Sequence, residues 1–263
     1  MSQIGIVDSL WRYPVKSMGG EELHEVFAGF AGFYGDRVFA FHSAKARKSL
    51  PYLTARDQGR MLLYRPRFRQ PEKTIAPPNL AEAEKTGAGT TPLYGSAEDF
   101  SLDVETPDGE KLAIDDPELI RQLCSGLAGE PELTLIRSER ALTDCRPVSI
   151  FALQTARALA EESGVPFNKR RFRANIYLDL TTMDGFAEDA FVGRSLRIGS
   201  KLTLAIVKRD QRCVIITLDP ETAEKSSALF QSVAQLHEGN AGLYAVVLVE
   251  GMVRPGDAVE LLP

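Results

Sequence analysis

Apolar residues occur in short runs along this chain, and that pattern limits the folds open to it. The longest uninterrupted runs among the 263 residues are about as long as a strand, for example 245–249. Apolar and polar residues alternate over 100–105 and 111–114, on either side of a Pro-Asp-Gly-Glu turn, which predicts a β-hairpin. Patterns typical of helices are limited to about 117–127, 155–162 and 223–236. The sequence therefore predicts an α+β fold that is rich in strands.

Composition and termini argue against several classes of protein. The formal net charge of −5 argues against a nucleic-acid binder, which usually presents a basic face. The N-terminal Met-Ser-Gln-Ile has no basic region followed by a long apolar segment, and no apolar run could cross a bilayer. The 3 cysteines are too few and too scattered for a disulfide framework, and their odd number suits a reducing compartment. We expect a cytoplasmic protein with no nucleic-acid and no membrane partner.

The chain divides into two predicted domains. Asp116, Pro117 and Glu118 have the order of a helix start, with an acidic N-cap candidate before a proline at the first helical position. We place the boundary there, so that an N-terminal β-rich domain over 1–115 packs on a C-terminal domain over 116–263. Residues 66–100 are rich in proline, glycine and polar residues, and they are predicted to form a loop or lid.

A single cysteine within 208–222 is the first candidate for chemistry. Cys213 follows Arg212 directly, with further cations at Lys208 and Arg209, and a β-branched run over 214–217 predicts a strand after it. Fixed positive charges favour the ionised thiolate, which can act as a nucleophile, a persulfide carrier or a soft metal ligand. The alternative is a buried cysteine that acts as a small apolar core residue.

A basic segment at 168–178 is the second candidate. If it is extended, Arg171, Arg173 and Asn175 lie on one side of the strand while the alternate residues face the core. Guanidinium groups bind phosphate oxygens with two parallel hydrogen bonds. The alternative is a solvated surface, which is what most runs of cations are.

Shorter polar motifs occur in the N-terminal part of the chain. Lys16 and Ser17 follow Tyr13-Pro14-Val15, so an ammonium group and a hydroxyl group are presented at a predicted strand end and could hold a phosphate. Arg37 begins a predicted strand after Gly35-Asp36, and Arg56 ends Thr54-Ala55-Arg56. Taken singly, each motif is also compatible with ordinary surface turns.

Together, these motifs resemble the two-domain branch of the MOSC family, which is named after the C-terminal domain of molybdenum cofactor sulfurase and includes the mitochondrial amidoxime-reducing component. The resemblance rests on Pro-Val-Lys-Ser, Asp-Arg, Arg-Phe-Arg-x-Asn, and Arg-Cys followed by Asp-Pro-x-Thr, in that order along the chain. It implies an N-terminal β-rich domain and a β-barrel-like MOSC domain. It also implies that Cys213 is the protein ligand to the molybdenum of a molybdopterin cofactor.

The resemblance assigns further residues to the same cofactor. They are Lys16, Ser17, Arg37, Arg56, Thr155, Arg171, Arg173, Asn175 and Arg212. The cations suit its phosphate, whereas Asn175 and Thr155 suit the edge of its pterin. The implied activity is reduction of N-hydroxylated small molecules.

The chain has no cysteine cluster typical of an iron–sulfur protein. Electrons are therefore expected from a separate ferredoxin, flavoprotein or cytochrome. Two alternatives remain open: a sulfur carrier that uses a Cys213 persulfide in cofactor sulfuration, and a cofactor carrier without catalysis. Pyridoxal phosphate binding is associated with the family as a whole, but the chain lacks the pyridoxal-phosphate desulfurase domain, so a partner would have to deliver the sulfur.

Overall fold

The computed structural model describes residues 2–47, 50–86, 95–125, 127–129 and 131–262, and their contacts define two compact units. The barrel unit consists of Met1–Trp11, Glu22–Phe33 and Cys145–Pro263, and the second unit consists of Arg12–Glu21 and Tyr34–Asp144. Both units thus combine segments that are separate in the sequence. Whether 1–115 and 116–263 are domains that fold independently stays a prediction.

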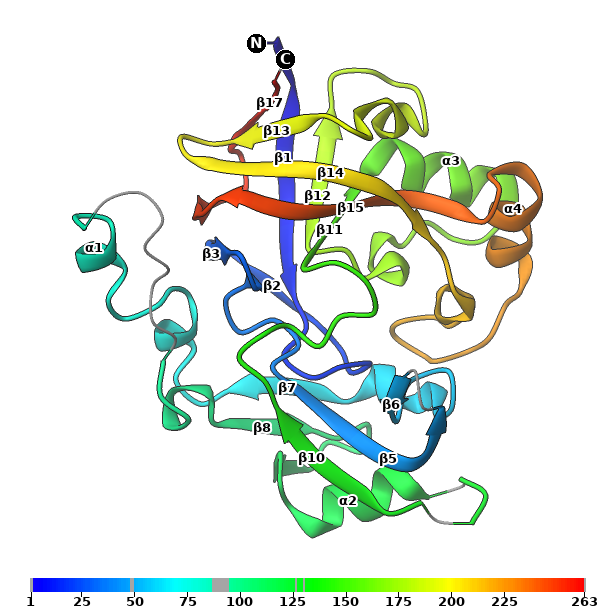
Figure 1. Cartoon of the computed structure of the whole chain (residues 1–263). Coiled ribbons are helices and arrows are strands. Elements are labelled where there is room, and N and C mark those ends of the chain that lie inside the picture. Colours follow the sequence, from blue (N-terminus) through cyan, green and yellow to red (C-terminus); the bar gives the residue numbers. More distant parts are fainter. Residues whose placement is uncertain (1, 48–49, 87–94, 126, 130, 263) are drawn as a thin grey trace. The chain divides into compact units, whose positions relative to one another are not determined.

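Seven strands of the barrel unit form a closed barrel (Figure 1). Their order is β12-β11-β15-β14-β13-β17-β1; pairing of β1 with β12 closes the ring, and β2 also pairs with β1. The strands are β1 (Ser2–Arg12), β2 (Glu21–Leu23), β11 (Val148–Ala152), β12 (Ile176–Leu180), β13 (Ser195–Ile198), β14 (Leu202–Gln211), β15 (Asn240–Val249) and β17 (Ala258–Leu261). The barrel confirms the predicted α+β, β-rich fold class.

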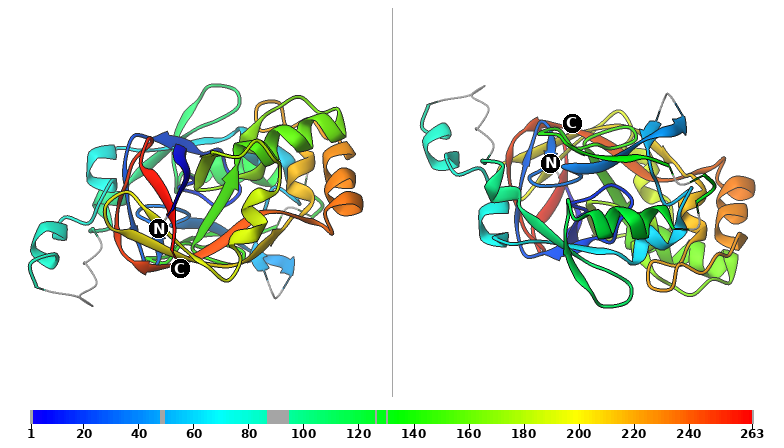
Figure 2. Two further views of the ribbon diagram at one scale, coloured as in Figure 1. Left: turned by 90° about the horizontal axis from the view of Figure 1, so that it is seen from above. Right: turned by 90° about the horizontal axis from the view of Figure 1, so that it is seen from below.

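One helix makes the crossover that the barrel requires. β11 and β12 are parallel, and parallel neighbours cannot be joined by a tight turn. Helix α3 (Leu153–Ser163) connects them and ends at Gly164, whose φ of 66° is the left-handed conformation common after helices. Helix α4 (Ala228–Leu236) lies beside α3 in both views of Figure 2 and in Figure 1. Leu159 of α3 and Leu229 of α4 belong to the same buried cluster, which lies on one side of the barrel.

The remaining elements of the barrel unit are short. Strands β3 (Val26–Gly29), β4 (Gly32–Phe33) and β16 (Gly251–Val253) form a small antiparallel sheet. Three 3₁₀ helices complete the described part of this unit: η4 (Lys169–Phe172), η5 (Ala187–Phe191) and η6 (Val214–Thr217). Two of them, η4 and η6, carry the candidate motifs.

The second unit contains two three-stranded sheets. Their orders are β10-β5-β6 and β7-β8-β9, with strands β5 (Phe39–Arg47), β6 (Leu50–Tyr52), β7 (Arg65–Phe68), β8 (Leu102–Glu105), β9 (Lys111–Ala113) and β10 (Leu133–Arg137). The antiparallel pair β8–β9 confirms the predicted hairpin. Helix α2 (Pro117–Cys124) confirms the predicted helix start, because the Asp116 side chain accepts a hydrogen bond from the Glu118 amide at 2.8 Å.

Residues 66–100 are more regular than predicted. Besides β7, this segment forms α1 (Leu80–Ala83) and the 3₁₀ helices η2 (Pro71–Thr74) and η3 (Glu98–Phe100), and η1 (Gly59–Leu63) precedes it. The prediction of a loop throughout is wrong here, because Phe68 and Phe100 are buried and form an aromatic contact. The part at 87–94 lies outside the described residues. Across the ranges that the structure describes, no helix combines the length and the apolar character needed to cross a membrane.

Close packing at β15 generates the first prediction. Gly242 has a φ of 77°, and a Cβ atom there would lie 2.5 Å from the Phe151 ring and 2.8 Å from the Ile150 carbonyl oxygen. We expect G242A to lower the free energy of unfolding by about 2–5 kcal/mol, through left-handed strain and overpacking. The matched control is G164A, where φ is 66° and nothing lies within 4 Å of the added carbon. Urea unfolding that gave equal losses for both variants would contradict the packing account.

Candidate functional site

Cys213 lies just beyond the end of strand β14. It is the N-cap residue of η6 and is half-buried. The predicted strand over 214–217 is wrong, because these residues form a 3₁₀ helix. The Thr217 hydroxyl donates to the Val214 carbonyl oxygen at 2.7 Å, and the Ile216 amide donates to the Cys213 carbonyl oxygen at 3.3 Å. These local bonds, with burial of Ile216, outweigh the strand preference of β-branched residues.

The arginine segment also departs from its predicted extended form. Residues 169–172 form η4, in which the Asn168 side chain accepts a hydrogen bond from the Arg170 amide at 3.1 Å. Arg173 ends the helix in a left-handed conformation with φ of 54°. The predicted alternation is therefore wrong, because it requires an extended backbone. Arg171 and Asn175 are both buried, at 8% and 1% exposure, as is the Phe172 that was expected to face the core.

Despite these local differences, the two candidate motifs meet in the barrel unit. Nη2 of Arg212 donates to the Phe172 carbonyl oxygen at 2.5 Å. Nη2 of Arg171 donates to the Asp219 carboxylate at 2.6 Å. The segment that carries Cys213 is therefore bonded twice to the segment that carries Arg171 and Arg173.

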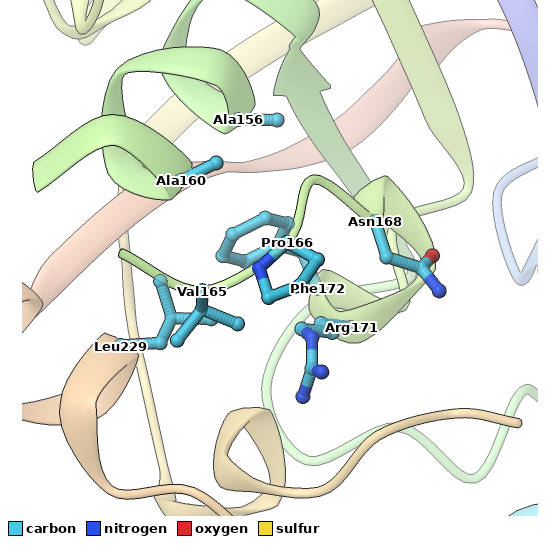
Figure 3. A pocket seen from close by; sticks show the side chains of 8 residues that line it. All are labelled: Ala156, Ala160, Val165, Pro166, Asn168, Arg171, Phe172 and Leu229. Atoms are coloured by element: carbon cyan, nitrogen blue, oxygen red, sulfur yellow. The ribbon is translucent and has the colours of Figure 1, made fainter. Parts of the chain in front are cut away.

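An apolar core supports this junction. Phe172 of η4 stacks on Phe151 of β11, with ring centroids 4.0 Å apart, and Ile216 of η6 is buried in the same cluster. A small pocket adjoins this core beside α3 and α4 (Figure 3). Its lining residues are Ala156, Ala160, Val165, Pro166, Asn168, Arg171, Phe172 and Leu229. Packing of Phe172 and Ile216 thus positions the polar residues next to them in the sequence.

Arg171 has unused capacity to bind an anion. Its side chain is only 7% exposed, and Asp219 is its ion-pair partner. Among the residues that the structure describes, neither Nε nor Nη1 of Arg171 has a hydrogen-bond partner. Buried N–H groups without partners are costly, so this guanidinium suits a ligand that brings oxygen atoms and negative charge. A phosphate-bearing cofactor meets that requirement, and the Cys213 thiol, on the segment bonded to Arg171 through Asp219, provides a soft donor for a metal.

Asn175 is buried in a structural network. Its Oδ1 accepts hydrogen bonds from the amide and the hydroxyl of Ser149, both at 3.1 Å. Its Nδ2 donates to the Trp11 carbonyl oxygen at 3.3 Å. The side chain thus joins β11 to β1, and a cofactor contact by Asn175 would require these bonds to rearrange.

Thr155 is similarly engaged, and its partner Glu188 was not singled out from the sequence. The Thr155 hydroxyl donates to Glu188 at 2.6 Å and accepts from the Phe186 amide at 2.7 Å. Glu188 also accepts from the Ala152 amide, next to the start of α3, at 3.3 Å. Both side chains are fully buried, and burial raises the pKa of Glu188 above its usual range. In this arrangement the pair stabilises the start of α3.

The second unit collects Lys16 and Arg56 around one carboxylate. Asp144 accepts from Nζ of Lys16 and from Nη2 of Arg56, each at 2.5 Å, and Lys16 also donates to the Leu142 carbonyl oxygen at 2.7 Å. Burial lowers the pKa of Lys16 even though Asp144 favours its charged form. Burial alone would raise the pKa of Asp144, but Lys16 and then Arg56 outweigh it and hold that pKa below its usual value. Two cations thus share the Asp144 carboxylate.

Ser17 and Arg37 belong to the same unit and both have left-handed backbones. Their φ angles are 67° and 48°, an uncommon conformation for residues other than glycine. Nη1 of Arg37 bonds to the buried Asp36 carboxylate at 2.5 Å, and its guanidinium lies 4.6 Å from the centre of the Tyr13 ring. Burial disfavours the charged form of Arg37, yet Asp36 outweighs this effect and raises the pKa of Arg37. Asp36 thus compensates the charge of Arg37 locally.

The sequence did not indicate the partners of three acids at these sites: Asp210, Asp219 and Glu188. Asp219 and Glu188 are far in sequence from their partners, and no local pattern indicated the pairing. Asp210 had a usable signal, since it is two residues before Arg212, and residues at this spacing on a strand lie on the same side. The structure pairs the Asp210 carboxylate with Nη1 of Arg212.

Two family models match this chain. The family model described as the MOSC N-terminal beta barrel domain matches residues 4–131, and the MOSC domain model matches residues 137–260. Among curated proteins no sequence relative is found. The crystal structure of the YuaD protein from Bacillus subtilis is similar, with a TM-score of 0.47 and 14% identity over 98% of this chain and 94% of that one. The crystal structure of YiiM from Geobacillus stearothermophilus is also similar, with a TM-score of 0.34 and 20% identity. The match covers 45% of this chain and 55% of that one.

Glu188 generates a prediction about pH. Because its pKa is raised in the folded state, the folded protein holds a proton that the unfolded chain releases near the usual value of 4.5. Stability should therefore fall as pH rises above 4.5, with a slope of at most about 1.4 kcal/mol per pH unit from this group. We expect E188Q to reduce that slope, measured by urea unfolding across the pH range. E161Q, on the exposed face of α3, is the control, and an unchanged slope in E188Q would contradict the assignment.

Proposed function

This chain belongs to the two-domain MOSC family, and from that premise we propose that it is a molybdenum-cofactor-binding oxidoreductase. One observation supports the proposal most strongly. Nη2 of Arg212, next to Cys213, binds the Phe172 carbonyl oxygen at 2.5 Å, so a thiol and an arginine-rich segment share one region of the barrel unit. A cofactor with a metal at one end and a phosphate at the other needs both kinds of group.

Cys213 and the arginines of η4 have separate roles in this proposal. Cys213 supplies a soft thiolate ligand, and its position at the start of η6 leaves it half-buried, within reach of a bound molecule. Arg171 supplies the two nitrogen atoms, Nε and Nη1, that lack partners among the described residues, and Arg173 adds a second guanidinium. Arg212 is bonded to Asp210 and to Phe172, so we assign it to holding the site together.

For residues of the second unit, we propose binding of an anionic group from the family resemblance alone. Lys16, Ser17, Arg37 and Arg56 are assigned by the family resemblance, and each cation among them already has an acid in its own unit. An incoming phosphate would compete with Asp144 for Lys16 and Arg56. For Thr155 and Asn175 a direct pterin contact also remains a proposal, and it requires exchange of the hydrogen bonds that they make now.

The proposed reaction is reduction of an N-hydroxylated compound, such as an amidoxime or a hydroxylamine. When bound, the molybdenum centre would supply the oxygen-atom and electron transfer. The overall change takes up two electrons and two protons, breaks the N–O bond and releases water. We propose that a separate ferredoxin, flavoprotein or cytochrome provides the electrons.

A sulfur carrier is the second candidate. It is favoured by the half-buried position of Cys213, because a thiol that receives sulfur must be reachable by a donor protein. The two candidates differ in the state of the same sulfur atom, which would be a metal ligand in one and a persulfide in the other. Mass spectrometry of the intact protein detects the persulfide as one added sulfur atom.

We predict that C213S lowers molybdenum content in protein purified from a host that makes the cofactor. Loss of a direct ligand should weaken retention by more than the roughly tenfold typical of losing an outer partner of a metal site. The matched control is C145S, which replaces another half-buried cysteine of the barrel unit. Elemental analysis that gave equal molybdenum in wild type and C213S would remove Cys213 from the metal site.

The proposed role of Arg171 gives a second prediction. R171Q should retain the cofactor roughly tenfold less well during dialysis, because a hydrogen bond to a charged group is lost. D219N is the comparison variant: its amide oxygen can still accept from the Glu221 amide, whereas its NH2 group replaces the oxygen that accepts from Arg171, so the ion pair is lost and the guanidinium is kept. If R171Q and D219N lose cofactor equally, Arg171 acts through its ion pair with Asp219 rather than as an anion ligand.

A further inference from the structure

We infer that Asp210 is a positioning residue, which fixes the Cys213 segment against the arginine segment by holding the guanidinium of Arg212. The inference rests on the proposed function only for the role of the thiol. The positioning itself is a property of the barrel unit, and it can be measured on the full chain without cofactor.

Asp210 has a buried environment. It lies near the end of β14, and it is only 6% exposed. Its carboxylate pairs with Nη1 of Arg212 and makes a hydrogen bond with the Tyr244 side chain. Burial, followed by the nearby Asp210, raises the pKa of Tyr244, so this phenol stays protonated and can donate to the carboxylate. A buried carboxylate needs such partners, and here they come from β15 and from the residue before Cys213.

The Arg212 guanidinium contacts several elements besides Asp210. Its other arm, Nη2, donates to the Phe172 carbonyl oxygen at 2.5 Å, and Nη1 also approaches the Ala241 carbonyl oxygen at 3.4 Å. The guanidinium carbon lies 5.6 Å from the centre of the Phe172 ring and 5.9 Å from that of Phe151. One planar group therefore contacts β15, η4 and the aromatic stack. Asp210 sets its orientation by binding one side of the fork.

The backbone at Cys213 is not held by the β14–β15 ladder. The β14–β15 ladder extends to Gln211 and Asn240, and it is irregular just before that point. The Arg212 amide adds one bond to the Gly239 carbonyl oxygen at 2.8 Å, after which the chain turns into η6. Cys213 thus lies beyond the ladder. Its placement against η4 depends on side chains, and Arg212 provides the nearest such link in the sequence.

The geometry that Arg212 imposes explains why an ion pair occupies positions 210 and 212. Buried ion pairs often stabilise a fold no better than apolar residues of similar volume, although they can select one geometry over another. An apolar pair at 210 and 212 could fill the space, but it could not donate to the Phe172 carbonyl. The expected signature is therefore local loosening of two specific segments.

Hydrogen exchange of the apo protein tests this signature directly. The reporting amides are Arg171 and Arg173 in η4, and Ile216 and Leu218 in η6, all of which make local backbone hydrogen bonds. We expect D210N to speed exchange at both pairs roughly tenfold or more, because a charge-assisted bond is weakened. Exchange in β13 and β17 should change much less, because β13 pairs with residues 202–205 of β14, away from Asp210, and β17 pairs with β13.

Two further variants keep the test decisive if D210N folds poorly. R212K keeps a cation for Asp210 but lacks the second arm, so we expect faster exchange in η4. The double variant D210N/R212K should loosen η4 no more than R212K alone, since Asp210 acts through Arg212. D189N is the control, because Asp189 is a more exposed acid that pairs with Arg209. It should leave the exchange rates of both segments within about twofold of the wild type.

Equal acceleration throughout the barrel, or additive effects of D210N and R212K, would overturn the inference. Molybdenum content of the wild type separates this failure from failure of the proposed function. Local loosening in a protein that binds no molybdenum would support positioning and overturn the cofactor proposal. A molybdenum-loaded wild type whose D210N variant exchanges uniformly would overturn positioning alone.

Discussion

The hydrogen bond from Arg212 to the Phe172 carbonyl oxygen is the interaction on which the candidate site depends. It joins the end of β14 to η4 and so brings the cysteine motif to the arginine motif. Stacking of Phe172 on Phe151 supports this hydrogen bond, and burial of Ile216 holds η6 in the same cluster. Without this junction, Cys213 and Arg171 would be polar residues on two unrelated turns.

Buried cations are the second constraint, and the two units meet it in similar ways. Arg171 has Asp219, Arg37 has Asp36, and Lys16 shares Asp144 with Arg56. Such partners offset the cost of removing charge from water. They also mean that an anionic ligand must either replace a carboxylate or use N–H groups that remain, as on Arg171. These cations therefore suit a strongly charged anion, because a weakly charged molecule would not compete with the acids.

Sequence patterns predicted the richness in strands, and the family resemblance predicted a barrel-like domain, but neither gave the local shape of the site. Alternation over long runs such as β14 reports burial on one face, and burial determines the strand. In short segments side-chain bonds to the backbone prevail: Asn168 caps η4, and Thr217 bonds to Val214 in η6. Acids such as Asp219 and Glu188 could not be assigned, since their partners are distant in sequence. Asp210 could have been assigned to Arg212 from their spacing of two residues.

X-ray absorption at the molybdenum edge tests the central claim most directly, because it counts the sulfur atoms bound to the metal. The comparison is between wild type and C213S, each loaded with cofactor to the extent that it binds. We predict that the wild type has one more sulfur neighbour than the dithiolene of the cofactor supplies, and that this neighbour is missing in C213S. An identical sulfur shell in both proteins would contradict the assignment of Cys213 as the metal ligand.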